Sequence, residues 1–212
     1  MKTKITKSNY TKFTRLLILS LAALILNVIT ALLAIQLHLV LFLDTVFTVA
    51  ITFYAGLIPG LLVALVYNPT MTVILCLKSG QSFFIYDSLY CICGMLIVLI
   101  TWALSKNKSN FQQNKIITVF YLIIISFASA IASCLLASFL DTFIRPLFGP
   151  TSGFGPTDTF SNSFVDLNIG DFLSYFLPRI PLTVLDRLIS TFAGYFIYKF
   201  LTKKKLPAKL ES

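Results

Sequence analysis

The sequence predicts an all-α integral membrane protein: a bundle of six transmembrane helices, with both termini cytoplasmic and a long extracellular loop between helices five and six. Three observations support this prediction. Of the 212 residues, 57% are hydrophobic and only 12% are charged, about half the charged share of a soluble domain. Apolar runs of about 20 residues, the length that crosses a bilayer, recur along the chain. Basic residues gather at both ends and in one middle loop, whereas acidic residues lie mostly between them.

Six apolar runs meet the length criterion for spans, namely 16–37, 39–56, 57–77, 82–104, 115–140 and 181–201. The second and third runs are short and share a tight connection from Gly56 to Gly60, in which Pro59 and Gly60 suit a turn. The first run is too long for the apolar core of a cleaved signal, so we expect it to remain as a span. The whole chain, 1–212, then forms one membrane domain, with 1–15 and 202–212 as basic cytoplasmic ends around the bundle of 16–201.

The basic residues determine the predicted orientation, because cytoplasmic loops carry the excess of Lys and Arg. They precede the first span, separate the fourth from the fifth and follow the sixth, so an even number of spans places all three groups on one side. This placement explains the net charge of +9 by contacts with membrane lipid rather than with nucleic acid. We therefore expect the protein in the cell membrane, plasma or bacterial inner, with no nucleic acid among its partners.

The long connection from 141 to 180 begins with a part rich in glycine and proline, Gly149 to Pro156, which disfavours regular structure. The stretch from Ile169 to Phe176 then suits a short helix at the membrane interface. Loops of this length are usually functional or disordered. A lid over a binding site and a plain linker both remain open.

Polar residues within the spans concentrate toward the predicted extracellular side. A charge in a span costs about 3 kcal/mol unless it faces protein or water, so each is a candidate for function. Asp44 and Arg187 lie at comparable depths and can pair, whereas Asp186 and Arg187 are adjacent and point in different directions, so we expect no direct pair between them. The candidate substrate-binding residues are Asp44, Thr48, Asn68, Tyr86, Asp87, Tyr90, Arg145, Arg179, Asp186 and Arg187.

Structural roles are the alternatives for several of these residues. Asp44 could instead hold two helices together, and Asn68-Pro69 gives either a broken helix that lines a site or a simple kink. Tyr86 and Tyr90 suit either a planar ligand or the aromatic girdle of the interface.

Other residue types give little sign of chemistry. His38 is the only histidine and is expected on the surface, and the four cysteines are expected to be packing residues. No metal site and no cofactor are therefore predicted. The sequence contains no phosphate loop and no evident pair of nucleophile and base, so we do not expect an enzyme.

Small residues form a seam along the first predicted span. Ala23, Asn27 and Ala31 recur every four residues, a spacing that lets helices approach closely in lipid. The fifth span is also rich in Ser and Ala between Ser126 and Cys134. One seam is enough for internal packing, and a second raises the prospect that one of them docks a partner protein.

Two stretches of the sequence resemble patterns found in a known protein family. The first is Phe42-Leu43-Asp44-Thr45, followed by Gly56, Pro59-Gly60 and an apolar run to Asn68; the second is Pro181…Asp186-Arg187-Leu-Ile-Ser190…Ala193-Gly-Tyr195. With these stretches, its size and its six-span layout, the chain resembles the substrate-binding (S) components of energy-coupling factor (ECF) transporters over about residues 16–202.

The resemblance implies a cavity near the extracellular face that binds a small vitamin-like nutrient. It also implies that the first-helix seam docks a transmembrane coupling subunit, which works with two cytoplasmic ATPases. Ala23 and Ala31 match that seam, and Asn27 replaces its middle alanine.

Two other functions remain open. One is a small membrane scaffold or sensor, similar to the rod-shape-determining MreD proteins, with no transported substrate. The other is a stand-alone carrier, which would need a polar route to the cytoplasm that the spans do not offer. The sequence does not identify the substrate.

Overall fold

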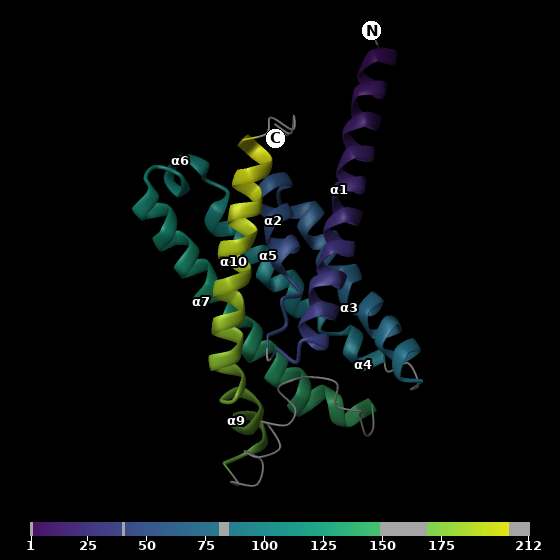
Figure 1. Cartoon of the computed structure of the whole chain (residues 1–212), viewed down its shortest axis with the longest axis vertical. Helices are drawn as coiled ribbons and strands as arrows, with labels where there is room; N and C mark the ends of the chain where they lie inside the picture. Colours follow the sequence, from purple (N-terminus) through teal and green to yellow (C-terminus); the bar gives the residue numbers. More distant parts are fainter. Residues whose placement is uncertain (1, 40, 81–84, 149–168, 204–212) are drawn as a thin grey trace.

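A computed structural model of the chain describes residues 2–39, 41–80, 85–148 and 169–203. Within these ranges every regular element is a helix (Figure 1). Five helical stretches are long and apolar enough to cross a membrane: Phe13–Gln36, Leu57–Lys78, Ile85–Ser105, Lys115–Phe148 and Asp171–Lys203. The all-helical, multi-pass membrane character that the sequence predicts is therefore present, with five long helical stretches rather than six.

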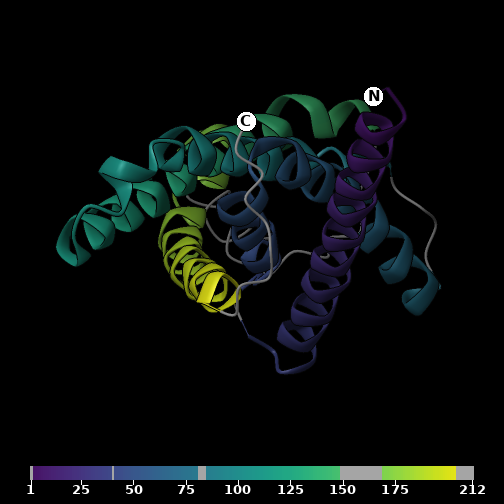
Figure 2. The same cartoon turned by 90° about the horizontal axis from the view of Figure 1, so that it is seen from above.

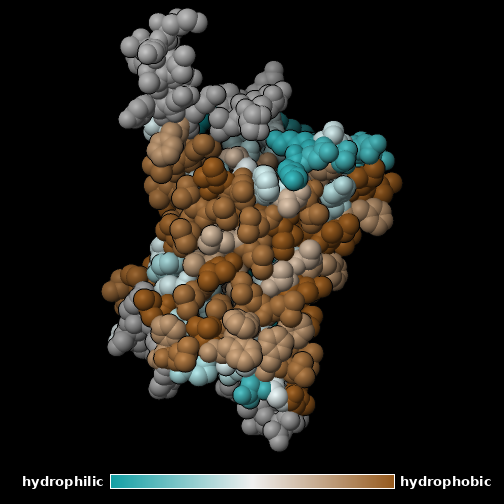
Figure 3. Space-filling view, turned by 180° about the vertical axis from the view of Figure 1, so that it is seen from behind, coloured by the Kyte–Doolittle hydropathy of each residue, from teal (hydrophilic) through white to brown (hydrophobic). Residues whose placement is uncertain are grey.

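The helices define two ends of the bundle. Helix α1 (Lys2–Gln36) starts and α10 (Arg179–Lys203) ends at one end, where the short helix α6 (Lys108–Phe111) also lies (Figure 1). We name this the terminal end. The short helices α4 (Ile85–Ser88) and α9 (Asp171–Phe176) lie at the opposite end, which we name the loop end. A broad hydrophobic belt separates hydrophilic surface at the two ends (Figure 3).

The prediction that 39–56 forms one helical span is wrong. The chain is not helical from Leu41 to Thr45, and only Val46–Ala55 forms a helix, α2, of 10 residues. At 1.5 Å per residue such a helix is about 15 Å long, half the thickness of the hydrocarbon core. Helix α2 lies in the interior of the bundle, in contact with α1, α10, α3 (Leu57–Ser79) and α5 (Cys91–Ser105) (Figure 2).

The turn between α2 and α3 falls at Gly56 rather than at Pro59 and Gly60. Gly56 has a φ of +90°, a conformation that glycine adopts readily. Pro59 and Gly60 lie in the first turn of α3. A side chain at Gly60 would collide with the Thr52 hydroxyl and lie 2.9 Å from Val98. The glycine therefore permits a close crossing of α3 with its neighbours.

Helix α3 continues through Pro69 without a break, so the broken-helix alternative for Asn68-Pro69 is wrong. Two hydroxyl groups bind backbone carbonyls beside the proline. Thr70 donates to the carbonyl of Val66 at 2.8 Å, and Thr72 donates to that of Asn68 at 2.9 Å. Such bonds help a helix to accommodate a missing backbone donor in a membrane.

The remaining helices follow the predicted spans with shifted ends. Helices α4 and α5 occupy the fourth span. Helix α7 (Lys115–Phe139) continues past the predicted end at 140 through the π-helical turn η1 (Leu140–Ile144) and the 3₁₀ turn η2 (Arg145–Phe148). The short helix predicted between Ile169 and Phe176 is present as α9. Gly149 to Pro156, and with it the choice between lid and linker, lies outside the described residues.

A cluster of aromatic and aliphatic side chains fills the half of the bundle nearer the terminal end. It contains Val49, Phe53, Ile97, Phe111, Leu122, Ile125, Tyr195 and Tyr198. Phe53 from α2 stacks on Phe111 from α6 with ring centroids 5.6 Å apart. We name this cluster the aromatic core.

Both small-residue seams are covered by the chain's own helices. Ala23 packs with Ile51 and Val63, and Ala31 packs with Tyr67 and Met71. Asn27, between them, is fully buried. In α7 the most buried small residues are Ser126, Ser129 and Ala130. In this arrangement both seams face the chain's own helices.

Candidate functional site

Two groups of charged and polar residues lie in the half of the bundle nearer the loop end. The Asp44 cluster consists of Asp44, Thr45, Asp186 and Arg187. The Asp141 cluster consists of Tyr86, Tyr90, Asp141, Arg145 and Arg179. Helix α10 contributes to both clusters, because Arg179 and Asp186 are two turns apart and share a face. Their separation along the helix axis is about 10 Å.

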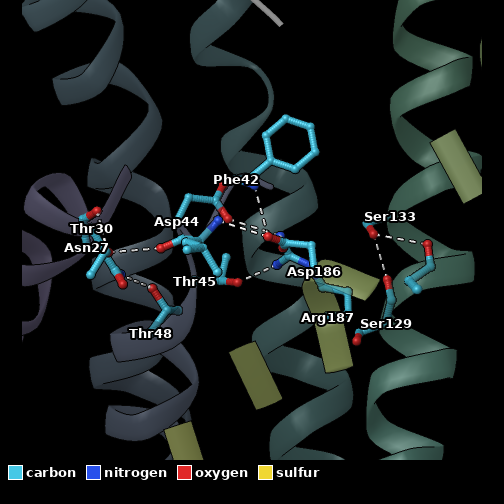
Figure 4. A network of polar contacts seen from close by, with 12 residues as sticks. Asn27, Thr30, Phe42, Asp44, Thr45, Thr48, Ser129, Ser133, Asp186 and Arg187 are labelled. Carbon is cyan, nitrogen blue, oxygen red and sulfur yellow. Dashed lines mark hydrogen bonds and ion pairs between the residues drawn. The ribbon is translucent and has the colours of Figure 1, made fainter. Parts of the chain in front are cut away.

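Asp186 in α10 holds the non-helical 41–45 segment through its backbone. Its Oδ1 accepts hydrogen bonds from the amide N–H groups of Phe42 at 2.9 Å and Leu43 at 2.8 Å (Figure 4). A further bond comes from α1, where Thr30 Oγ1 donates to the Leu43 carbonyl at 2.9 Å. Backbone polar groups within a membrane bundle need partners. The segment is stable there because α1 and α10 supply them.

Arg187 connects the 41–45 segment to α10 through side chains. Its Nη2 pairs with Asp44 Oδ1 at 3.0 Å and with Asp186 Oδ2 at 2.5 Å, and its Nη1 donates to Thr45 Oγ1. The Asp44–Arg187 pair predicted from depth is therefore present. The prediction that Asp186 and Arg187 do not pair is wrong, because the long arginine side chain brings its guanidinium back to the neighbouring carboxylate.

The beginning of α2 is held from α1. Asn27 Nδ2 donates to Thr48 Oγ1 at 2.7 Å, and Asn27 Oδ1 accepts from the Phe47 amide at 2.9 Å. Phe47 lies in the first turn of α2, where amide groups have no partner within the helix. Asn27 thus caps α2 from a neighbouring helix, and this explains why an asparagine interrupts the alanine seam.

The Asp141 cluster is centred on one buried carboxylate in η1. Tyr86 and Tyr90 each donate a hydrogen bond from the hydroxyl to Asp141 Oδ1, both at 2.6 Å. Arg179 forms an ion pair with Oδ2, and Arg145 lies 3.8 Å from Oδ1. The Tyr86 and Tyr90 rings meet edge to face, 5.7 Å apart. Side chains from four elements, α4, η1, η2 and α10, together with Tyr90 before α5, therefore meet at Asp141.

The remaining predicted site residues lie at the margins of these clusters. Thr48 is buried and held by Asn27 beside the Asp44 cluster. Asp87 is half-buried in α4, next to Tyr86. Asn68 is half-buried in α3, and in the described ranges its side chain makes no hydrogen bond to either cluster. His38 is exposed, as predicted.

Asp141 and Thr45 are site residues that sequence reasoning missed. Asp141 follows the predicted end of the fifth span by one residue, so the span boundaries assign it to the loop. The signal was present in the sequence: an acid at the edge of an apolar run, followed at i+4 by an arginine. Thr45 gave no such signal, because a threonine next to Asp44 is equally compatible with a helix cap.

Buried charge is confined to the loop-end half of the described structure. The buried charged side chains there are Asp141, Arg179, Asp186 and Arg187. In the other half, the buried polar residues Thr101, Ser105 and Ser126 donate to carbonyls of their own helices. The interior of the bundle is therefore charged in its loop-end half and largely apolar in its terminal half.

The arrangement can orient a small polar molecule. Carboxylate, guanidinium, phenol and hydroxyl groups can orient a ligand through hydrogen bonds and charge. Among the described residues, no group of three or more His, Cys, Asp or Glu side chains is placed to hold a metal ion.

Comparisons with known proteins identify no relative: no family model, no curated protein and no solved structure matches the chain.

Proposed function

We propose that the protein is the substrate-binding subunit of an ECF-type transporter. In this proposal it captures a small vitamin-like nutrient from outside the cell at the loop end, and both termini lie in the cytoplasm. A coupling subunit in the membrane and two cytoplasmic ATPases then drive uptake. The protein itself would not hydrolyse ATP.

The observation that carries this proposal is the separation of buried charge from the aromatic core. Asp44, Asp141, Arg179, Asp186 and Arg187 lie in one half of an otherwise apolar bundle. Ionisable groups inside a membrane bundle are rare and usually mark a ligand or ion site. A site placed near one face suits a protein that receives its ligand from that side.

The aromatic core argues against a stand-alone carrier. Val49, Phe53, Phe111 and Tyr195 pack together between the clusters and the terminal end. A carrier that works alone needs polar groups along a route to the other side, near the centre of the membrane. A subunit that delivers its ligand together with a partner does not need such a route within its own chain.

A scaffold or sensor is the second candidate, and one observation favours it. The carboxylates and guanidinium groups of both clusters pair largely with one another, as they would if they only held helices together. The two candidate functions differ in whether the protein binds a small-molecule ligand. A transporter subunit binds a small molecule, and a scaffold does not.

The decisive experiment is native mass spectrometry of the full chain purified from cells grown in rich medium. A transporter subunit should retain a small molecule that dissociates at higher collision energy, and it should co-purify with a large membrane protein and two ATPases. Thermal unfolding in detergent, with and without a panel of water-soluble vitamins, provides an independent measurement. A ligand-free spectrum together with unfolding temperatures that no vitamin raises would favour the scaffold.

A further inference from the structure

The Asp44 cluster holds more negative than positive charge. Asp44 and Asp186 face the single guanidinium of Arg187, and no other described charged side chain lies within ion-pair distance of these three. An uncompensated charge inside a membrane bundle is unfavourable. With both carboxylates ionised, the cluster therefore lacks one positive charge, which a bound molecule can supply.

Asp186 has no capacity left for a ligand. Its side chain is 0% exposed. One oxygen accepts the amide groups of Phe42 and Leu43, and the other pairs with Arg187. Replacing the two amide bonds would remove contacts that hold the 41–45 segment.

Arg187 is also committed, so it is a poor site for an anion. Its two terminal nitrogens bind Asp44, Thr45 and Asp186, and its side chain is 5% exposed. The Nε–H group has no acceptor within the described ranges, but protein atoms cover it. Arg187 is therefore a positioning residue that fixes Asp44.

Asp44 is the one member of the three with an available acceptor. Its side chain is 23% exposed, the largest exposure in these ion pairs. Arg187 binds only Oδ1, and in the described part of the chain no ion pair reaches Oδ2. A carboxylate held on one oxygen presents the other in a fixed direction.

We propose that the molecule bound at the Asp44 cluster carries a cationic nitrogen, and that this nitrogen donates a hydrogen bond to Oδ2 of Asp44. The inference rests on the proposed function and narrows its substrate class to amines and protonated bases. Such a ligand restores charge balance in the cluster without breaking any of its internal bonds. The Asp141 cluster is less suited to a cation, because two arginines and two phenol donors already surround its carboxylate.

Amine and alcohol analogues with the same skeleton test the inference directly. The probes are tryptamine and tryptophol, putrescine and 1,4-butanediol, with indole-3-acetate as an anion, each titrated calorimetrically into the purified full chain. Because the acceptor is charged, we expect each amine that binds to do so about 10- to 100-fold more tightly than the alcohol with the same carbon skeleton. Asp44→Asn should remove this preference, and Asp44→Glu should retain part of it.

Asp171→Asn is the matched control, because Asp171 is an exposed acid at the same end of the bundle. It should keep the preference for the amine in full. Circular dichroism and thermal unfolding of ligand-free Asp44→Asn separate lost binding from lost folding, and Asp44→Glu provides a second folded variant.

The outcomes distinguish this inference from the proposed function. Equal or tighter binding of an alcohol or of indole-3-acetate, or a preference that survives Asp44→Asn, overturns the inference alone. A co-purified compound without a basic nitrogen does the same. If no probe binds and no small molecule co-purifies, the proposed function fails as well.

Discussion

Asp186 is the residue through which α10 holds the backbone of the 41–45 segment. Its carboxylate accepts two backbone amides of the 41–45 segment and pairs with Arg187. Asp44, by contrast, contacts only Arg187 within the cluster and is partly exposed. The two acids therefore differ in what their removal does, although both pair with the same arginine.

Asp186→Ala should destabilise the protein by about 3–5 kcal/mol, the usual effect of breaking a buried ion pair. The additional cause is that the amides of Phe42 and Leu43 lose their acceptor. SDS-induced unfolding in detergent micelles measures the change in free energy. Asp171→Ala is the control and should change it by less than about 0.5 kcal/mol. Equal stability of the two variants would contradict this role for Asp186.

Tyr86 and Tyr90 should each contribute through a hydroxyl group rather than only through a ring. Because each donates to the Asp141 carboxylate, Tyr86→Phe and Tyr90→Phe should each cost about 1.5–3 kcal/mol of unfolding free energy. The double variant should deviate from the sum, since both bonds share one oxygen. Tyr121→Phe is the control, because the Tyr121 ring packs against Phe111 and, within the described residues, its hydroxyl makes no hydrogen bond. A loss of the same size in Tyr121→Phe would show that the Asp141 bonds are not the cause.

At the scale of elements, the sequence predicts the long helices well and the second span poorly. A count of apolar residues finds a helix wherever the run is long enough, and this succeeds for α1, α3, α5, α7 and α10. It fails at 39–56, because the count assumes that the backbone of an apolar run forms all its hydrogen bonds within one helix. Asp186, more than 140 residues away along the chain, bonds the 41–45 backbone instead. No local pattern contains that information.

The contact between α10 and α2 depends on the absence of a side chain at Gly194. A Cβ there would lie 2.9 Å from the Val46 carbonyl and 2.9 Å from Val49 Cγ1. Gly194→Ala should therefore force α10 away from α2 and destabilise the fold by about 1–3 kcal/mol, typical of overpacking. SDS unfolding measures this change.

Gly94→Ala provides a graded comparison for Gly194→Ala. Its added Cβ would meet the Ala64 Cβ at 3.3 Å, a contact that a small shift relieves. We expect Gly94→Ala to cost less than Gly194→Ala. The reverse order would mean that α2 can yield to α10 more easily than the close backbone contact indicates.

For the whole molecule, the sequence predicts the polarity of the bundle but not the pairing within it. Depth along each span brings Asp44 and Arg187 to the same level, and the structure pairs them. The same reasoning cannot show that Asp141 collects two tyrosines and two arginines, because those residues come from different elements. Pairing depends on how the helices rotate about their axes and cross one another, and the residue pattern of a single sequence does not reveal this.

The orientation of the bundle is the last prediction, and it decides which side supplies the ligand. Basic residues at the terminal end, such as Lys106, Lys108 and Lys203, predict that this end lies in the cytoplasm. In a Cys91→Ser background, where the other native cysteines are buried, a membrane-impermeant maleimide should label Asp171→Cys on intact cells. Ser109→Cys in α6 should react only after the membrane is opened. Both positions are exposed, so access to the reagent, rather than burial, determines the result. Labelling in the opposite order would place both polar clusters near the cytoplasm, and capture of a nutrient from outside would then be excluded.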